Sequence, residues 1–175
     1  RPEATQCNAV KKTQQTTPPP ADEPLDIWTR DALEEAQRSD GEIQKVYDAL
    51  QMSPDKPEKK ETALWSRESK ILLHSWPRLK IRDGVLYRKF VELDGLRDIW
   101  QLVVPTKYRQ EAFTRAHTGM TGGHLGLAKT QDQIQRRMYW PTWKSDSELF
   151  LRRCAPCAQY HRGSAPKQAR LNSFP

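Results

Sequence analysis

The sequence has 175 residues, of which 36% are hydrophobic and 29% charged, and it contains 13 prolines. This composition is too polar to fill one core over the whole length, so it predicts ordered modules joined by solvated connectors. No apolar run approaches the roughly 20 residues that cross a bilayer, and no signal-peptide segment is recognisable. We therefore expect an intracellular protein that is not secreted and has no membrane partner.

Positive charge is concentrated in the C-terminal part of the chain. Residues 105–175 carry twelve Lys and Arg against four Asp and Glu, a net charge of +8, whereas residues 1–104 carry seventeen against eighteen. A basic excess of this kind favours contact with phosphate backbones. Lysines and arginines that only solvate helix faces would give the same count, so charge alone leaves both interpretations open.

The N-terminal part is predicted to be a disordered linker followed by helices. Residues 1–24 lack apolar periodicity and contain a Thr-Pro-Pro-Pro run, which is typical of a disordered or polyproline-like segment. Residues 25–78 are predicted to be a helical connector region. Its first helix starts near Pro24 to Asp26 and ends near Ser39, and Asp40 is the N-cap of the second. After a break rich in Pro, Lys and Glu, a third helix is expected over residues 62–75.

Residues 79–104 are predicted to form a small antiparallel β meander. Asp83-Gly84 and Asp94-Gly95 are tight-turn dipeptides, and they flank the β-rich run from Val85 to Phe90. A further β-rich run covers residues 99–104. Because an isolated hairpin is marginal in water, we expect the meander to cap one side of the module that follows.

Residues 105–161 predict three short helices. Apolar spacing places them at about residues 106–116, 125–138 and 142–153, and a glycine-rich loop over residues 118–123 permits a tight bend after the first. Three helices of about a dozen residues cannot bury enough surface to fold alone. The segment therefore needs a further source of stability.

Four residues of this segment form a candidate metal site. His117, His124, Cys154 and Cys157 offer two imidazoles and two thiolates, a complete tetrahedral set for Zn²⁺ that leaves no position for a catalytic water. Such a metal is structural, and its binding free energy, ~10–16 kcal/mol in zinc-finger peptides, becomes folding free energy. We expect one structural Zn²⁺ as the cofactor.

Other interpretations of single residues remain open at this point. The Cys-x-x-Cys pair alone would also suit a redox protein, which needs a lowered thiolate pKa. His161 extends the two cysteines to part of a zinc-knuckle pattern, although that set has only three ligands. Trp140 and Trp143 are candidates for base stacking, but their helical spacing favours a place in the core. His74 and Cys7 have no partner that would make them ligands.

The residues between the candidate ligands carry a family resemblance. The segment of about residues 105–160 resembles the His-His-Cys-Cys zinc-binding domain of integrases from gypsy-type retrotransposons and retroviruses. A weaker resemblance, to the segment that precedes integrase in such polyproteins, extends upstream. The residues that carry these resemblances are Gly123-His124-Leu125-Gly126, Lys129-Thr130, Ile134, Tyr139-Trp140-Pro141, Cys154 and Cys157, and upstream Trp76-Pro77 and Asp83 to Arg88.

The resemblance implies both a fold and a role. The expected fold is mainly α, with a small zinc-stabilised three-helix bundle preceded by the β meander and by a helical, partly disordered N-terminal region. The implied role is that of an integrase module in a pol polyprotein, which supports integrase multimerisation and binds the ends of the element's DNA. Its expected partners are DNA and either itself or the rest of the integrase, with no small-molecule substrate. The expected location is the nucleus or a cytoplasmic retroelement particle.

We expect no enzymatic activity from this chain. In the family, strand transfer belongs to a following core with three carboxylates, whereas the parent polyprotein would carry integrase and RNA-directed DNA polymerase activities. The chain starts with Arg1 and ends at Pro175, so we interpret it as a fragment whose residues 162–175 are a basic linker towards that core. The basic residues expected to contact DNA are Arg162, Lys167 and Arg170 in the linker, and Arg136, Arg137, Lys144, Arg152 and Arg153 on the helices.

A different class of function is also consistent with the sequence. A domesticated host protein would use the same zinc module for protein–protein interaction. That function requires exposed apolar residues on the bundle, whereas DNA binding predicts an affinity that falls with salt.

Overall fold

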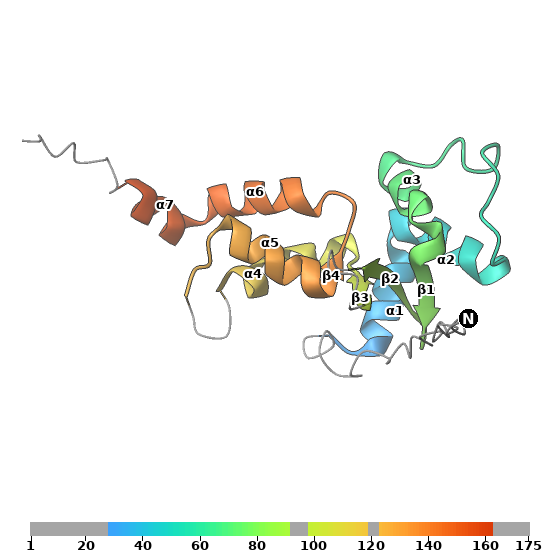
Figure 1. Cartoon of the computed structure of the whole chain (residues 1–175), viewed down its shortest axis with the longest axis horizontal. Helices are drawn as coiled ribbons and strands as arrows, with labels where there is room; N and C mark the ends of the chain where they lie inside the picture. Colours follow the sequence, from blue (N-terminus) through green and yellow to red (C-terminus); the bar gives the residue numbers. More distant parts are fainter. Residues whose placement is uncertain (1–27, 92–97, 119–122, 163–175) are drawn as a thin grey trace, which may run out of the picture.

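The computed structural model describes residues 28–91, 98–118 and 123–162 (Figure 1). The predicted linker over residues 1–24, the Asp94-Gly95 turn and most of the basic tail lie outside these residues. The elements, in chain order, are α1 (Arg30–Ser39), α2 (Gly41–Met52), α3 (Arg67–His74), the 3₁₀ helix η1 (Trp76–Arg78), β1 (Leu79–Arg82), β2 (Val85–Val91), β3 (Asp98–Val103), α4 (Thr106–Thr118), α5 (Leu127–Arg137), β4 (Met138–Tyr139), α6 (Trp143–Arg153) and α7 (Ala155–Arg162).

Helices predominate, and a small sheet lies between two groups of them. The bundle of α4, α5 and α6 lies at one end of the molecule, and α1, α2 and α3 lie at the other (Figure 1). The expected mainly α fold is thus confirmed. A single hydrophobic cluster runs from Trp28 to Trp143 and includes buried side chains of both helix groups and of the sheet. The division of the chain into separate domains stays a prediction.

The sheet has four strands in the order β1-β2-β3-β4. The two pairings within β1, β2 and β3 are antiparallel, which confirms the predicted meander. Strand β4 pairs in parallel with β3, with Leu102 opposite Met138 and Val103 opposite Tyr139. The predicted sheet was therefore incomplete, because it did not include β4. The second helix of the bundle ends at Arg137, and Met138 is already extended, because its side chain and that of Tyr139 are buried beside the sheet.

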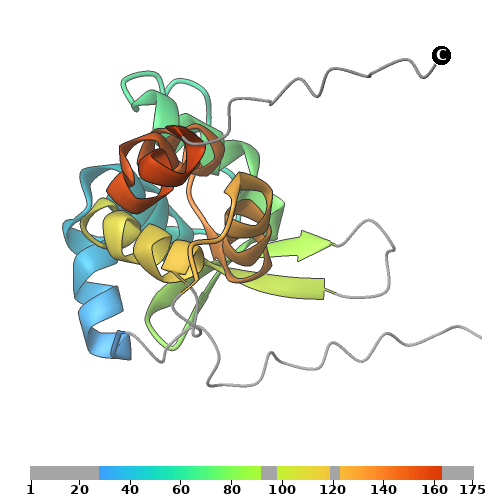
Figure 2. The ribbon, with the colours of Figure 1, turned by 90° about the vertical axis from the view of Figure 1, so that its left-hand side faces the viewer.

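The turn between β1 and β2 is the one that the sequence predicts. Asp83 and Gly84 have φ values of 47° and 78°, both in the left-handed region, as two-residue hairpin loops of type I′ require. The Tyr47 hydroxyl donates a hydrogen bond of 2.8 Å to the Gly84 carbonyl. This bond joins α2 to the turn. The β2–β3 hairpin extends away from the helices at its other end (Figure 2).

Helices α1 and α3 begin later than the sequence predicts. Helix α1 starts at Arg30, because the Thr29 hydroxyl accepts a hydrogen bond from the backbone N–H of Ala32 and so ends the extended segment. Helix α3 starts at Arg67 rather than at residue 62, and it is only eight residues long. Ser66 caps it, and Leu64, which lies within the predicted helix, is 96% exposed in a turn. The Asp40 N-cap of α2 is confirmed.

Helix α4 is held by the upstream helices at several places. The backbone N–H of Thr106 donates a 2.7 Å hydrogen bond to the Asp40 carboxylate at the start of α2. Arg109 forms a 2.7 Å ion pair with Glu68 of α3, and both side chains are largely buried. Trp28, just before α1, stacks on Tyr108 with ring centroids 5.0 Å apart. The bundle and the upstream helices are therefore one packed unit.

Candidate metal centre

Four different elements bring the candidate ligands together. His117 lies in the last turn of α4, and His124 lies in the segment that returns from α4 to α5. Cys154 is the C-cap of α6, and Cys157 lies on α7. One ligand atom from each side chain lies within 4.8 Å of all the others. The set that the sequence predicts is therefore assembled in the fold.

The closest separations define which atoms face the centre. Nε2 of His117 lies 2.9 Å from Nδ1 of His124, 3.4 Å from Sγ of Cys154 and 3.3 Å from Sγ of Cys157. Sγ of Cys154 lies 3.3 Å from Nδ1 of His124. Zinc–nitrogen and zinc–sulfur bonds of about 2.0 and 2.3 Å in a tetrahedron would put its corners roughly 3.3–3.8 Å apart. The three nitrogen–sulfur separations agree with that arrangement and the nitrogen–nitrogen separation is shorter, and the donor set fits Zn²⁺.

A short hydrogen bond closes the loop that carries His124. The backbone N–H of Leu125 donates to the carbonyl of His117 at 2.7 Å, so the residue after one ligand is tied to the other ligand's own backbone. Residues 119–122 lie between these two points and outside the described residues. The predicted tight return after α4 is borne out by this contact.

The ring of His117 is buried in an aromatic environment. It is 1% exposed, and it lies edge-on to Phe150 with ring centroids 5.8 Å apart. Burial lowers the pKa of His117, and the nearby His124 lowers it further, although a backbone hydrogen bond with Leu125 acts in the opposite direction. The neutral imidazole, which is the form that binds a metal, is therefore favoured in the fold.

The cysteines do not have the environment of a redox pair. Both are free thiols and both are partly buried. Burial raises the pKa of Cys157, and a hydrogen bond with Cys154 raises it further. A thiol–disulfide oxidoreductase needs the opposite change. The redox interpretation also leaves the two histidines beside the thiols without a role.

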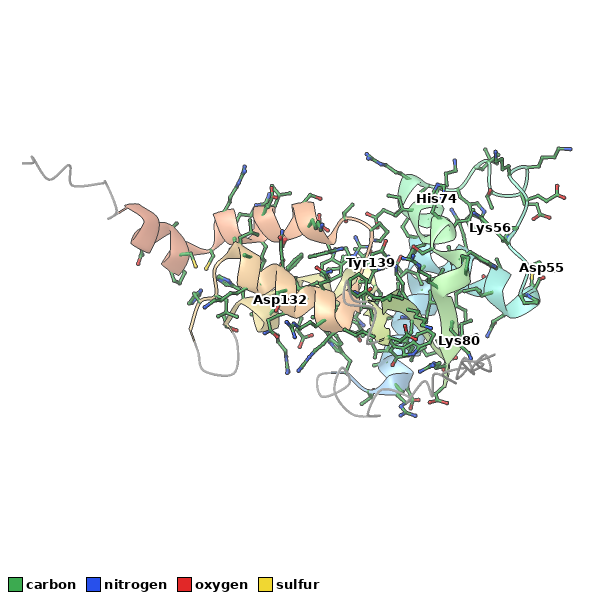
Figure 3. All side chains as sticks on the ribbon, in the orientation of Figure 1. Asp55, Lys56, His74, Lys80, Asp132 and Tyr139 are labelled. Atoms are coloured by element: carbon green, nitrogen blue, oxygen red, sulfur yellow. The ribbon has the colours of Figure 1, made fainter. Side chains whose placement is uncertain are left out.

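The structure decides among the remaining alternatives where it describes the residues. Trp140 is 0% exposed and Trp143 is 9% exposed, so both belong to the core and neither is a stacking platform for bases. His74 is an exposed residue of α3 (Figure 3). The side chain of His161 lies outside the described residues. The zinc-knuckle interpretation would leave His117 and His124 without a role, whereas the structure places both beside the two cysteines.

The predicted DNA-contacting residues fall on two helices of the bundle. Arg136 and Arg137 end α5, whereas Lys144, Arg152 and Arg153 belong to α6, and all five residues are exposed. Arg136 forms a 2.9 Å ion pair with Asp132, which reduces the charge that it offers to a ligand. Lys167 and Arg170 lie outside the described residues, and so does the side chain of Arg162.

Two features of the centre are not predicted by the sequence analysis. Helix α7, which carries Cys157, was not predicted, because eight residues that include a proline give too short a pattern. The role of Thr130 was also missed. Thr130 is 0% exposed, and its hydroxyl lies 3.5 Å from Nδ1 of His117. Its only signal in the sequence was its place in the Lys129-Thr130 pair.

The fold and the site together define a helical domain built around a cluster of two histidines and two cysteines. Residues 104–162, about a third of the chain, match the family described as the integrase zinc binding domain. This segment is an integrase zinc-binding domain, and no catalytic domain is detected in the 175 residues. Neither the curated proteins nor the solved structures gave a significant match to the chain. In the part of the chain that the structure describes, no helix has the length and the hydropathy of a membrane span.

Proposed function

We propose that the chain is the zinc-binding part of a retroelement integrase, in which one structural Zn²⁺ is bound by His117, His124, Cys154 and Cys157. The observation that carries this proposal is the convergence of four ligand atoms within 4.8 Å inside the segment that matches the integrase family. The ion closes the bundle because it joins the ends of α4 and α6 to α7 and to the loop before α5. It supplies stability rather than chemistry, since all four positions are filled by protein ligands.

In this proposal the domain supports integrase multimerisation and binds the ends of the element's DNA. The charge of the bundle supports the second role, because Lys144, Arg152 and Arg153 are exposed and form no ion pair with a described residue. The strand-transfer chemistry would belong to another part of the integrase, so this chain alone would be inactive. The expected location is the nucleus or a retroelement particle, where such DNA is present.

DNA binding is tested by the salt dependence of affinity for a short duplex with the element's terminal sequence or, failing that, any duplex of the same length. Replacing Arg152 and Arg153 by Gln should weaken binding and reduce the salt slope by about 1.8, since each phosphate contact contributes about 0.9. The matched control replaces Lys56 and Lys59, which are also exposed but lie in the loop between α2 and α3, at the opposite end of the molecule (Figure 1). Equal slopes for all three proteins would contradict the assignment of these arginines.

A specific observation also favours protein–protein contact through the bundle. Leu149 of α6 is 50% exposed, and it lines a groove of about 530 Å³ between α4 and α6 together with Phe113 and Phe150. Leu149 is an exposed apolar residue on the bundle, the kind of residue that self-association, or the interaction role of a domesticated protein, requires. Sedimentation equilibrium of the wild type and of Leu149→Gln tests it. A concentration-dependent dimer that Leu149→Gln abolishes would support the contact, and a monomer at all concentrations would exclude it.

A further inference from the structure

Thr130 occupies an unusual position for a threonine in a helix. It lies in the first turn of α5 and is 0% exposed, although threonine is normally a surface residue. Its hydroxyl donates a 3.2 Å hydrogen bond to the carbonyl of Leu125, and the same oxygen lies 3.5 Å from Nδ1 of His117. A buried hydroxyl placed between these two groups calls for a role other than packing.

The ring of His117 needs a partner on the side away from the metal site. Its Nε2 faces the other three ligand atoms, so the lone pair for the metal must be on Nε2 and the hydrogen on Nδ1. Because the ring is 1% exposed, that N–H must find an acceptor within the protein. Among the described residues, the Thr130 hydroxyl lies 3.5 Å from Nδ1, and the backbone of Leu125, to which this hydroxyl is itself bonded, is a second hydrogen-bond partner of the ring.

The hydrogen bond to Leu125 determines how the hydroxyl acts on the ring. A hydroxyl has one hydrogen to donate and two lone pairs to accept. Since the hydrogen of Thr130 is donated to the Leu125 carbonyl, only a lone pair is left for His117. The hydroxyl therefore stabilises the tautomer with the hydrogen on Nδ1, and this tautomer leaves Nε2 free to bind a metal.

The same hydroxyl also fixes the segment that carries the second histidine. Leu125 follows His124 directly, and its N–H donates to the carbonyl of His117 at 2.7 Å while its own carbonyl accepts from Thr130. Both backbone groups of Leu125 are thus bound to elements of the site. A change at Thr130 would act on both histidines at once.

We propose that Thr130 is a positioning residue of the metal centre, which sets the tautomer of His117 and the placement of His124. The inference rests on the proposed zinc site. Partners of this kind outside the ligand shell typically change metal affinity 10–100-fold when they are removed. Removal of the Thr130 hydroxyl should therefore lower the zinc affinity by a factor in that range.

The test compares variants of the full chain in their zinc affinity, measured by competition with a chromophoric chelator. Thr130→Val keeps the shape and removes the hydroxyl, and it should weaken zinc binding about 10–100-fold. Thr130→Ser keeps the hydroxyl and should restore most of the affinity. The matched control is Thr62→Val, since Thr62 is also buried and also donates to a backbone carbonyl, that of Glu58, but belongs to the upstream loop. Equal affinities for wild type and Thr130→Val would overturn the proposal.

A second measurement distinguishes the orientation of the ring from general stability by comparing the zinc-loaded wild type, Thr130→Ser and Thr130→Val. In long-range ¹H–¹⁵N spectra His117 should carry its hydrogen on Nδ1, and this hydrogen should exchange more slowly in the wild type and in Thr130→Ser than in Thr130→Val. An Nε2-protonated His117, or an Nδ1 hydrogen that exchanges equally slowly in the wild type and in Thr130→Val, would also overturn the proposal. Absence of zinc from the wild type would instead refute the proposed function.

Discussion

Asp40 connects the upstream helices to the bundle by its two carboxylate oxygens. One oxygen accepts hydrogen bonds of 3.0 and 3.3 Å from the N–H groups of Glu42 and Ile43 in α2. The other accepts the 2.7 Å bond from Thr106, the first residue of α4. Burial alone would raise the pKa of Asp40, but the bonds from Thr106, Glu42 and Ile43 outweigh it and lower the pKa below its usual value.

Two substitutions separate these contributions. Asp40→Asn keeps one oxygen for α2 but faces Thr106 with an amide that cannot accept, so it should cost about 1 kcal/mol, the typical net value of one hydrogen bond. Asp40→Ala removes both, and loss of the N-cap adds about 1 kcal/mol, giving a total of about 2 kcal/mol. We expect these losses of stability to be no larger, because Thr106 is exposed and water partly replaces the lost acceptor.

The assay is urea unfolding of the zinc-loaded chain, followed by circular dichroism and by tryptophan fluorescence. Asp55→Asn is the control, because Asp55 is exposed in the loop after α2 (Figure 3) and its side chain caps no helix. A lowered pKa stabilises the fold above the usual value of about 3.9. That stability is lost as the pH falls through the folded pKa of Asp40, and Asp40→Asn should lack this step. Equal midpoints for Asp40→Asn and wild type would refute the double-cap role.

Three further predictions concern the site and the core. Because the pKa of His117 is lowered, its contribution to stability should be complete above about pH 6.5 and lost as the pH falls through its folded pKa; zinc release against pH should therefore have its midpoint below 6.5. Gln37→Leu removes the buried hydrogen bonds that this side chain makes with the N–H and carbonyl of Leu86 and with the carbonyl of Val103, and urea unfolding should show a loss of about 2–3 kcal/mol. Residues 104–162 alone should lack cooperative thermal unfolding even with zinc, whereas residues 28–162 should retain it, because the core is shared.

Local patterns predicted the parts of the site that depend on neighbouring residues in the sequence. The ligands His117 and Cys154 lie where amphipathic helices were expected to end, and the Asp83-Gly84 turn follows from the need for positive φ. Helix ends were less predictable. Residues 62–64 belong to the predicted third helix, but they form a turn in which the apolar side chain of Leu64 is exposed.

Contacts between distant segments could not be predicted in this way. Strand β4 is two residues long and exists only because β3 lies beside it; the paired residues Val103 and Tyr139 are thirty-six positions apart in the sequence. Likewise, Asp40 was recognised as the cap of its own helix, but nothing local indicates that it also accepts from Thr106. The position of Thr130 behind His117 depends on the same tertiary packing.

The most direct test of the whole account measures zinc content and folding in the same preparation. The full chain should contain one zinc per molecule, and a chelator should remove the zinc together with much of the helical signal. His124→Ala and Cys157→Ser should lose the metal, whereas Cys7→Ser, which changes a cysteine outside the site, should keep it. A helical protein that contains no metal and is indifferent to chelator would contradict the zinc site and the integrase function proposed from it.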